Sequence, residues 1–211
     1  MLITLPDSDL TTFYISAWSE PIIELARKNG IKPIPIRGKN VTSWSVEQNI
    51  KSKNPNFLAF NGHGSPISIC GQDDEPLIVL GSNEHLLDSR IVHALSCSCA
   101  KELGRKSKAK AFIGYDDWFW LYFDGNKTAK PLEDSKVKPV LESALEAPKQ
   151  IVKGKTAQEA YEESQKMYQK NIDELTISSS KHTSEEIQVI LPFLDWNKKC
   201  QKLYGDPNAK I

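Results

Sequence analysis

The sequence has 211 residues, 39% of them hydrophobic and 9% aromatic, which is enough for one compact domain with a sizeable core. Its 27 basic and 27 acidic residues give a formal net charge of +0, which argues against a nucleic-acid partner or a membrane surface. No apolar stretch approaches the roughly 20 residues that span a bilayer, and the first residues do not have the pattern of a signal peptide. Four cysteines are too few for a disulfide scaffold, so we expect free thiols and a cytoplasmic location.

The first part of the chain alternates strand and helix patterns, which predicts an α/β fold with a mostly parallel sheet. In chain order the predicted elements are a strand over 2–5, a helix around 10–17, a second helix from a cap at Ser19 to Gly30, an edge strand over 31–36, a helix over 41–54, a buried strand over 56–60, a hairpin over 66–81, a buried strand over 90–97, a helical turn over 100–104 and a strand over 110–115.

From residue 137 onward the pattern is helical. Apolar spacing predicts helices over 137–154 and 156–175, and a third helical stretch over 183–206. Thr156 with Glu159 forms a capping box, and Thr183 or Ser184 before Glu186 is a second helix start. We therefore expect one domain over 1–211, with a sheet-rich catalytic half over 1–125 and a mostly helical half over 126–211 that ends in the segment LYGDP.

Two of the predicted buried strands end close to a reactive side chain. His63 follows the strand over 56–60, and Cys97 ends the strand over 90–97. In a parallel sheet, ligands bind beyond the carboxyl ends of the strands. If these strands are neighbours, the imidazole and the thiol lie in one cleft.

A cysteine–histidine pair of this kind is suited to nucleophilic catalysis. A free thiol has a pKa near 8.5, so it needs a base or a helix N-terminus to become a thiolate at neutral pH. His63 is the expected base, and the helical turn after Cys97 is expected to assist through its dipole. Gly62 and Gly64 allow a substrate to approach the backbone, and the amides of Gly64 and Cys97 are expected donors to an oxyanion.

The other cysteines and histidines have weaker contexts. Cys70 and Cys99 are expected to be small buried hydrophobes, and His93, inside a strand, a core or edge residue. His85 lies in a loop and His182 precedes a helix cap.

The two blocks that end at His63-Gly64 and at Cys97 resemble those of the caspase-like (clan CD) cysteine peptidases, which include caspases, metacaspases, legumain and gingipains. The sequence ALSCSCAKELG followed by KAFIGY adds to this likeness, and the C-terminal KLYGDPNA is similar to the ending of gingipain-type catalytic domains. The resemblance covers residues 2–122 and that tail, and is strongest to gingipain-type or caspase-like bacterial or archaeal peptidases.

The resemblance implies a caspase-like three-layer sandwich, with a mostly parallel sheet of about six strands and helices on both faces. It implies a cysteine endopeptidase that acts on peptides or proteins without a cofactor, through a dyad of Cys97 and His63 and an oxyanion hole at Gly64 and Cys97. In this family the loop after the first strand helps to build the specificity pocket.

We expect cleavage after Arg or Lys, because a desolvated carboxylate pairs well with a guanidinium. Asp7 or Asp9 would form the base of the pocket, unless either only caps the next helix. Asp116 and Asp117 compete for the same role, and Trp118 and Trp120 would wall the pocket.

Two other classes of function stay open. A zinc site would use His63, Cys70, Cys97, Cys99 and His85, but Cys97 and Cys99 have a poor chelating spacing. A catalytically silent caspase-like interaction or regulatory domain would have the same fold without turnover. Cys99 also competes with Cys97 as the nucleophile, and we prefer Cys97 because it ends the strand.

Overall fold

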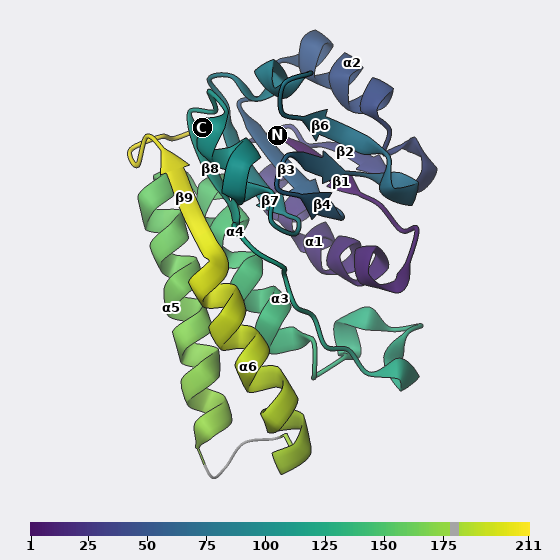
Figure 1. Ribbon diagram of the computed structural model, residues 1–211, viewed down its shortest axis with the longest axis vertical. Coiled ribbons are helices and arrows are strands. Elements are labelled where there is room, and N and C mark those ends of the chain that lie inside the picture. Colours follow the sequence, from purple (N-terminus) through teal and green to yellow (C-terminus); the bar gives the residue numbers. More distant parts are fainter. Residues whose placement is uncertain (178–181) are drawn as a thin grey trace.

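The structure is a computed structural model that describes residues 1–177 and 182–211, and its centre is a six-stranded sheet in the order β2-β1-β3-β7-β8-β9. The first five of these strands are parallel and the last is antiparallel, as Figure 1 shows. The strands are β1 (Leu2–Leu5), β2 (Ile34–Arg37), β3 (Phe57–Asn61), β7 (Ile91–Leu95), β8 (Ala111–Tyr115) and β9 (Gln201–Gly205). The predicted α/β fold with about six strands is confirmed, and the proline-containing strand β2 does lie at an edge.

Helices and a smaller sheet cover the two faces of the central sheet. The first face packs against α1 (Leu10–Lys28), α3 (Lys138–Ala144), α4 (Glu146–Val152), α5 (Ala157–Thr176) and α6 (Ser184–Cys200). The second face packs against α2 (Ser43–Lys53), the antiparallel sheet of β4 (Gly64–Ser65), β5 (Ser68–Cys70) and β6 (Pro76–Val79), and a π-helical turn over Ala100–Gly104. Among the described helices, none is both long and apolar enough to cross a bilayer.

Alternation along the strands explains the two faces. Side chains of a strand point to opposite faces in turn, and both faces of a parallel sheet are buried. The first face carries Ile3, Leu5, Phe57, Ala59, Ile91, Leu95, Ala111, Ile113 and Tyr115. The second carries Leu2, Leu58, Phe60, Val92, Ala94 and Phe112. The inner strands are therefore mostly apolar on both faces, which makes them recognisable in the sequence.

The prediction of two helices before Gly30 is wrong, because α1 runs without a break from Leu10 to Lys28. Pro21 lies inside it and removes only one backbone donor. Ser19 does not cap a new helix; its hydroxyl donates to the carbonyl of Ile15 one turn earlier. The capping boxes at Thr156 and Thr183 are confirmed.

The helix predicted over 137–154 is divided into α3 and α4 at Leu145. Pro148 explains the break, because it has no N–H to donate to the carbonyl of Ala144 four residues earlier. The ring of His93, on β7, forms a hydrogen bond with the backbone of Ala144 instead. The strand residue thus satisfies a polar group that the proline leaves without its helical partner.

The strand β9 was not predicted, because the helical pattern of α6 was extended over it. Gly205 at its end has a φ of +90°, and a Cβ there would lie 2.5 Å from the carbonyl oxygen of Lys110. Only glycine fits this close approach. The segment LYGDP therefore closes the edge of the sheet against β8, and one strand belongs to the half of the chain that was predicted to be helical.

The burial of His93 predicts a pH dependence of stability. Burial lowers the pKa of His93 to about 4, because a charged imidazole is costly in the core, although the bond to Ala144 acts in the opposite direction. Between its unfolded pKa of about 6.5 and pH 4, the unfolded chain binds the proton and the folded chain does not. The free energy of unfolding should therefore fall by about 3 kcal/mol as the pH drops through this window.

Chemical denaturation at pH 7 and at pH 4 measures this loss in the parent, in His93→Leu, and in His85→Leu as a control at an exposed histidine. His93→Leu should lose about 3 kcal/mol less than the parent between the two pH values, while His85→Leu should behave as the parent does. Equal losses in all three proteins would contradict the assignment.

Candidate active site

The predicted nucleophile and base follow two neighbouring parallel strands. β3 pairs with β7 up to Asn61 and Leu95, which are 34 positions apart (95 − 61 = 34). His63 and Cys97 are separated by the same 34 positions (97 − 63 = 34), and each follows the last paired residue of its strand by two positions. We expect both strands to bring their reactive residues to one edge of the sheet. This requires paired residues of β3 and β7 to be 34 positions apart, and they are.

The two segments also touch beyond the strands. The hydroxyl of Ser96 donates to the carbonyl of His63 over 2.6 Å. A Cβ at Gly64 would lie 2.1 Å from the Ser96 hydroxyl and 3.0 Å from the carbonyl oxygen of Cys97. Glycine at position 64 is therefore required for the backbone after His63 to pack against the backbone of Cys97.

The ring of His63 is held by a carboxylate from the loop after β1. Nε2 of His63 lies 2.6 Å from Oδ2 of Asp9. Asp9 is the N-cap of α1, and its Oδ1 accepts from the amide of Thr12 over 2.8 Å. Partial burial acts to raise the pKa of Asp9, but the Thr12 amide and His63 outweigh it and hold this pKa below its ordinary value. Asp9 is thus an anion, fixed by the helix, that points at the imidazole.

This contact decides which ring nitrogen of His63 is available. A hydrogen bond at one nitrogen of an imidazole fixes the tautomer and the orientation of the ring. With the Nε2 proton directed to Asp9, Nδ1 is the ring nitrogen that this contact leaves without a proton. The carboxylate therefore orients the imidazole, and the role of His63 as a base stays a prediction.

Of the two candidate sulfurs, that of Cys97 is the accessible one. Cys99 is fully buried, which raises its pKa to about 12, and its thiol donates to the carbonyl of Ser96 over 3.3 Å. Cys97 is partly exposed, and its Sγ accepts from the amide of Phe119 over 3.4 Å. Burial raises the pKa of Cys97, the Phe119 amide lowers it, and the charge of Asp117 raises it.

The expected help from a helix dipole is not observed. The π-helical turn begins at Ala100 and spans only five residues, and the pKa of Cys97 is raised. The residue after Cys97 instead occupies a strained position: Ser98 has a φ of +56°. Its amide donates to the carbonyl of Asp117 over 2.9 Å, which ties the turn to the loop after β8.

The amides of Gly64 and Cys97, predicted to form an oxyanion hole, are not engaged by a backbone acceptor. Gly64 faces Ile69 in the β4–β5 ladder, and the flanking amide of Cys70 donates to the carbonyl of His63. Gly64 and Ile69 are therefore a non-hydrogen-bonded pair, in which the Gly64 amide does not donate to its partner strand. Within residues 1–177 and 182–211, the Cys97 amide has no acceptor either. That both amides bind an oxyanion stays a prediction.

The carboxylates proposed for a specificity pocket differ in their surroundings. Asp9 already contacts the Thr12 amide and the His63 ring, and Asp116 pairs with Lys202 at 3.5 Å. Asp117 accepts from the amide of Trp118 over 2.8 Å.

Asp7 is exposed. Its carboxylate oxygens lie 3.2 Å from the position of a Cβ on Gly38, and its amide donates to Gln72. Of the four carboxylates considered for the pocket, those of Asp7 and Asp117 are therefore the two that have no cation beside them among the described residues, and a contact of either with substrate stays a prediction.

The other histidines belong to other parts of the fold, whereas Cys70 lies beside His63, whose carbonyl accepts from the Cys70 amide over 2.9 Å. His93 is buried in β7, His85 lies in a short helical turn over Glu84–Leu87, and His182 approaches Glu186 at 3.5 Å. Cys70 is half-buried on β5, with Ser68 at 3.9 Å from its sulfur. Across the described residues, no three His, Cys, Asp or Glu side chains are grouped so that they would hold a metal ion.

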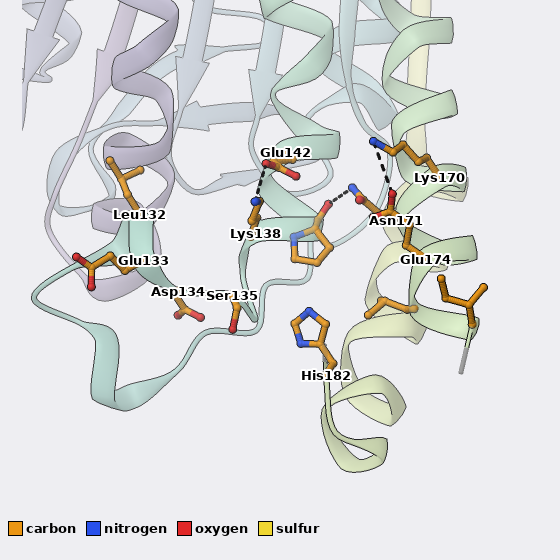
Figure 2. Close-up of a pocket in the computed structure, with 13 residues that line it drawn as sticks. Leu132, Glu133, Asp134, Ser135, Lys138, Glu142, Lys170, Asn171, Glu174 and His182 are labelled. Carbon is orange, nitrogen blue, oxygen red and sulfur yellow. Dashed lines mark hydrogen bonds and ion pairs between the residues drawn. The ribbon is translucent and has the colours of Figure 1, made fainter. Parts of the chain in front are cut away.

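A cavity of about 800 Å³ lies elsewhere, between the loop over 132–135, α3, α5 and His182. Figure 2 shows its charged side chains, and Lys138 pairs there with Glu142 and Lys170 with Glu174. None of the predicted site residues lines it. Its size alone therefore gives it no part in the chemistry of Cys97.

Sequence reasoning missed three parts of the site. Asp9 was considered for a pocket base or a helix cap, and its contact with His63 spans 54 positions, so no local pattern announces it. Ser96 and the backbone of Phe119 were also missed. The run of aromatic residues after Tyr115 was the available signal for Phe119, because such a run beside a strand end is unusual outside a binding surface.

The fold is similar to that of a solved structure described as a complex of the pro- and mature domains of RgpB from Porphyromonas gingivalis. The TM-score is 0.56 and the sequence identity 11%, over 98% of this chain and 47% of that chain. This chain therefore spans about half the length of the protein it matches. No protein-family model and no curated protein sequence matches the chain. At this identity the likeness concerns the fold alone, and it agrees with a caspase-like three-layer arrangement of helices around a mostly parallel sheet.

Proposed function

We propose that the chain is a cysteine endopeptidase in which Cys97 attacks the substrate and His63 transfers the proton. The observation that carries this proposal is the common offset of 34 positions: β3 and β7 pair as parallel neighbours with this offset, and the same offset separates His63 from Cys97. The carboxylate of Asp9 on His63 supports it, as do the two backbone amides left without a ladder partner. The substrate class is a peptide or protein.

The chemistry follows from these groups. Because burial keeps the Cys97 thiol protonated at neutral pH, His63 Nδ1 takes its proton as Sγ bonds to the scissile carbonyl carbon. The carbonyl oxygen gains negative charge and accepts from the amides of Gly64 and Cys97. The C–N bond then breaks, and His63 returns the proton to the departing amine. Water, deprotonated by His63, hydrolyses the thioester and restores the thiol.

We propose that the peptidase prefers a substrate with a basic residue before the cleaved bond. Asp117 is the acidic residue whose charge acts on Cys97 most directly. Asp7 lies in the same loop as Asp9, the ligand of His63. Neither carboxylate has a cation beside it among the described residues, so an Arg or Lys side chain would supply the missing charge.

The second candidate is a catalytically silent caspase-like interaction domain. One observation favours it: the sulfur of Cys97 is covered by the backbone of Phe119, and burial raises its pKa. A protein of this kind would keep the fold without forming the thiolate.

Active-site labelling separates the two candidates. A peptidyl acyloxymethyl ketone with Arg or Lys before the reactive group should alkylate Cys97 alone, because Cys99 is fully buried, and intact-mass and peptide mass spectrometry locate the adduct. His63→Ala should slow the labelling by about a hundredfold or more, the usual share of a general base. Labelling of another cysteine, or no labelling at all, would favour the silent domain.

Substitution of Asp9 tests the orienting role of the carboxylate. Asn is as good an N-cap as Asp, so Asp9→Asn should leave the free energy of unfolding within about 0.5 kcal/mol of the parent. It should lower kcat/KM by about ten- to hundredfold, because the ring of His63 loses its anionic partner. Thr12→Val, which alters the same cap without removing the carboxylate, is the control and should retain kcat/KM. Parent-like turnover by Asp9→Asn would assign Asp9 to the helix cap only.

Charge reversal tests the basic preference. In Asp7→Lys and Asp117→Lys, kcat/KM for Arg substrates should fall relative to that for norleucine substrates, by about tenfold in at least one variant. Glu163→Lys, a reversal on the exposed side of α5, is the control for net charge. If both variants keep the ratio of the parent, neither carboxylate recognises the basic side chain.

A further inference from the structure

Three tryptophans form an exposed aromatic surface next to Cys97. Trp118 and Trp120 come from the loop after β8, and Trp196 comes from α6. Their exposed fractions are 60%, 44% and 40%, and together they line a cleft of about 250 Å³, here called the tryptophan cleft. A patch of large, exposed aromatic side chains often marks a site that binds another molecule.

The loop that carries Trp118 and Trp120 contacts Cys97 through the residue between them. Phe119 lies between Trp118 and Trp120, and its amide is 3.4 Å from Sγ of Cys97. Its ring turns to the core and contacts Tyr115 at 4.8 Å between ring centroids. In an extended segment, alternate side chains point in opposite directions. The two tryptophans therefore face outward together, on the side of the loop away from the core.

Helix α6 holds this loop in place. Asn197 is fully buried, and its side chain accepts from the amide of Trp120 over 2.9 Å and donates to its carbonyl over 2.7 Å. The indole N–H of Trp196 donates to the carbonyl of Trp118 over 2.9 Å. A buried amide is costly unless its polar groups are bonded, and here both are used on one residue of the loop. The aromatic surface is thus pre-organised, which reduces the entropy lost when a ligand binds.

The rings themselves form a continuous stack. Trp118 and Trp120 are 6.2 Å apart between centroids, and Trp120 and Phe193 are 5.6 Å apart, with interplanar angles of 22° and 26°. The stack thus joins the loop after β8 to α6, which carries Phe193. Because Phe119, the neighbour of Trp118, contacts Cys97, an extended peptide that advances by about 3.3 Å per residue would bring a side chain near the cleaved bond to these rings.

The rings that line the tryptophan cleft carry no charge, and two of the carboxylates near it are paired. Asp116 is paired with Lys202 at 3.5 Å, and Asp195, beside Trp196, with Lys199 at 2.5 Å. The third, Asp117, accepts from the amide of Trp118 and is the carboxylate proposed above for the basic residue. The N–H of Trp196 is already bonded to the loop. The volume of the tryptophan cleft, about 250 Å³, equals that of about eight water molecules at about 30 Å³ each. This volume suits one large side chain.

We infer that the tryptophan cleft is a specificity subsite that binds a large apolar or aromatic side chain of the peptide substrate, close to the cleaved bond. This inference rests on the proposed peptidase function and adds to it a second recognition element, separate from the carboxylates proposed for the basic residue. Trp118 and Trp196 are its specificity-determining residues, and Asn197 is a positioning residue for the loop.

The test is a set of fluorogenic tetrapeptide amides in which each position in turn carries Ala, Leu, Phe, Trp, Lys or Glu. At one position Phe or Trp should exceed Ala in kcat/KM by about tenfold or more. Trp118→Ala and Trp196→Ala should abolish this preference, measured as the ratio of kcat/KM for the Phe or Trp peptide to that for the Ala peptide. Trp44→Ala, which removes a tryptophan that is 71% exposed on α2, is the matched control and should keep the preference.

Two outcomes would overturn the inference while the peptidase function stands. One is a preference for large apolar residues that survives in Trp118→Ala and Trp196→Ala, or that appears at no position. The other is a preference for Lys at one position that Trp118→Ala abolishes, which would assign the tryptophan cleft to a cation held by cation–π contact.

If no peptide is cleaved, the peptidase function fails and a binding experiment decides the inference alone. Cys97→Ala protein is titrated calorimetrically with acetylated tetra-alanine amide and with its variants that carry a single Phe. Tighter binding of one Phe peptide, lost in the Trp118→Ala background and kept in the Trp44→Ala background, supports the subsite. Equal affinity for all these peptides overturns it.

Discussion

The constraint on which the site depends is the pairing of two parallel strands in one register. β3 and β7 are paired with a constant offset, and the same offset separates His63 from Cys97. A slip by one residue would turn every side chain of one strand to the opposite face. Since both faces are buried and closely packed, such a slip would place side chains of the wrong volume in both cores and is unfavourable. The register that leads to His63 and Cys97 is therefore fixed by packing along the whole strand, and not by contacts at the site alone.

Around this pair, the loops at the carboxyl edge of the sheet each contribute one polar element. The loop after β1 supplies Asp9, which both starts α1 and holds His63. The loop after β8 supplies the Phe119 amide at the sulfur and the carbonyl that fixes Ser98. Because α6 anchors this second loop through Asn197, the helical half of the chain takes part in the site although it carries neither dyad residue.

The sequence predicts the parts of the fold and the site that depend on local patterns. The buried strands were recognisable because both of their faces are apolar, and His63 and Cys97 because each follows such a run directly. The strand β9 was missed because its partner β8 lies about ninety residues earlier, and the preceding helical pattern runs into it. The undivided α1 was missed because Pro21 was taken as a helix start, whereas a proline costs one backbone bond and packing compensates for it. The roles of Asp9, Ser96 and Phe119 were missed because each is a contact between segments distant in the sequence, for which one chain without its fold contains no signal.

The most direct test of the shared edge is a crystal structure of the chain after reaction with a peptidyl ketone. If β3 and β7 deliver both residues to one carbonyl, the ketone carbon is bonded to Sγ of Cys97, Nδ1 of His63 lies within hydrogen-bond distance of the adduct, and the former carbonyl oxygen accepts from the amides of Gly64 and Cys97. An adduct on another sulfur, or a Cys97 adduct with the imidazole of His63 turned away from it, would contradict the joint action of the two residues.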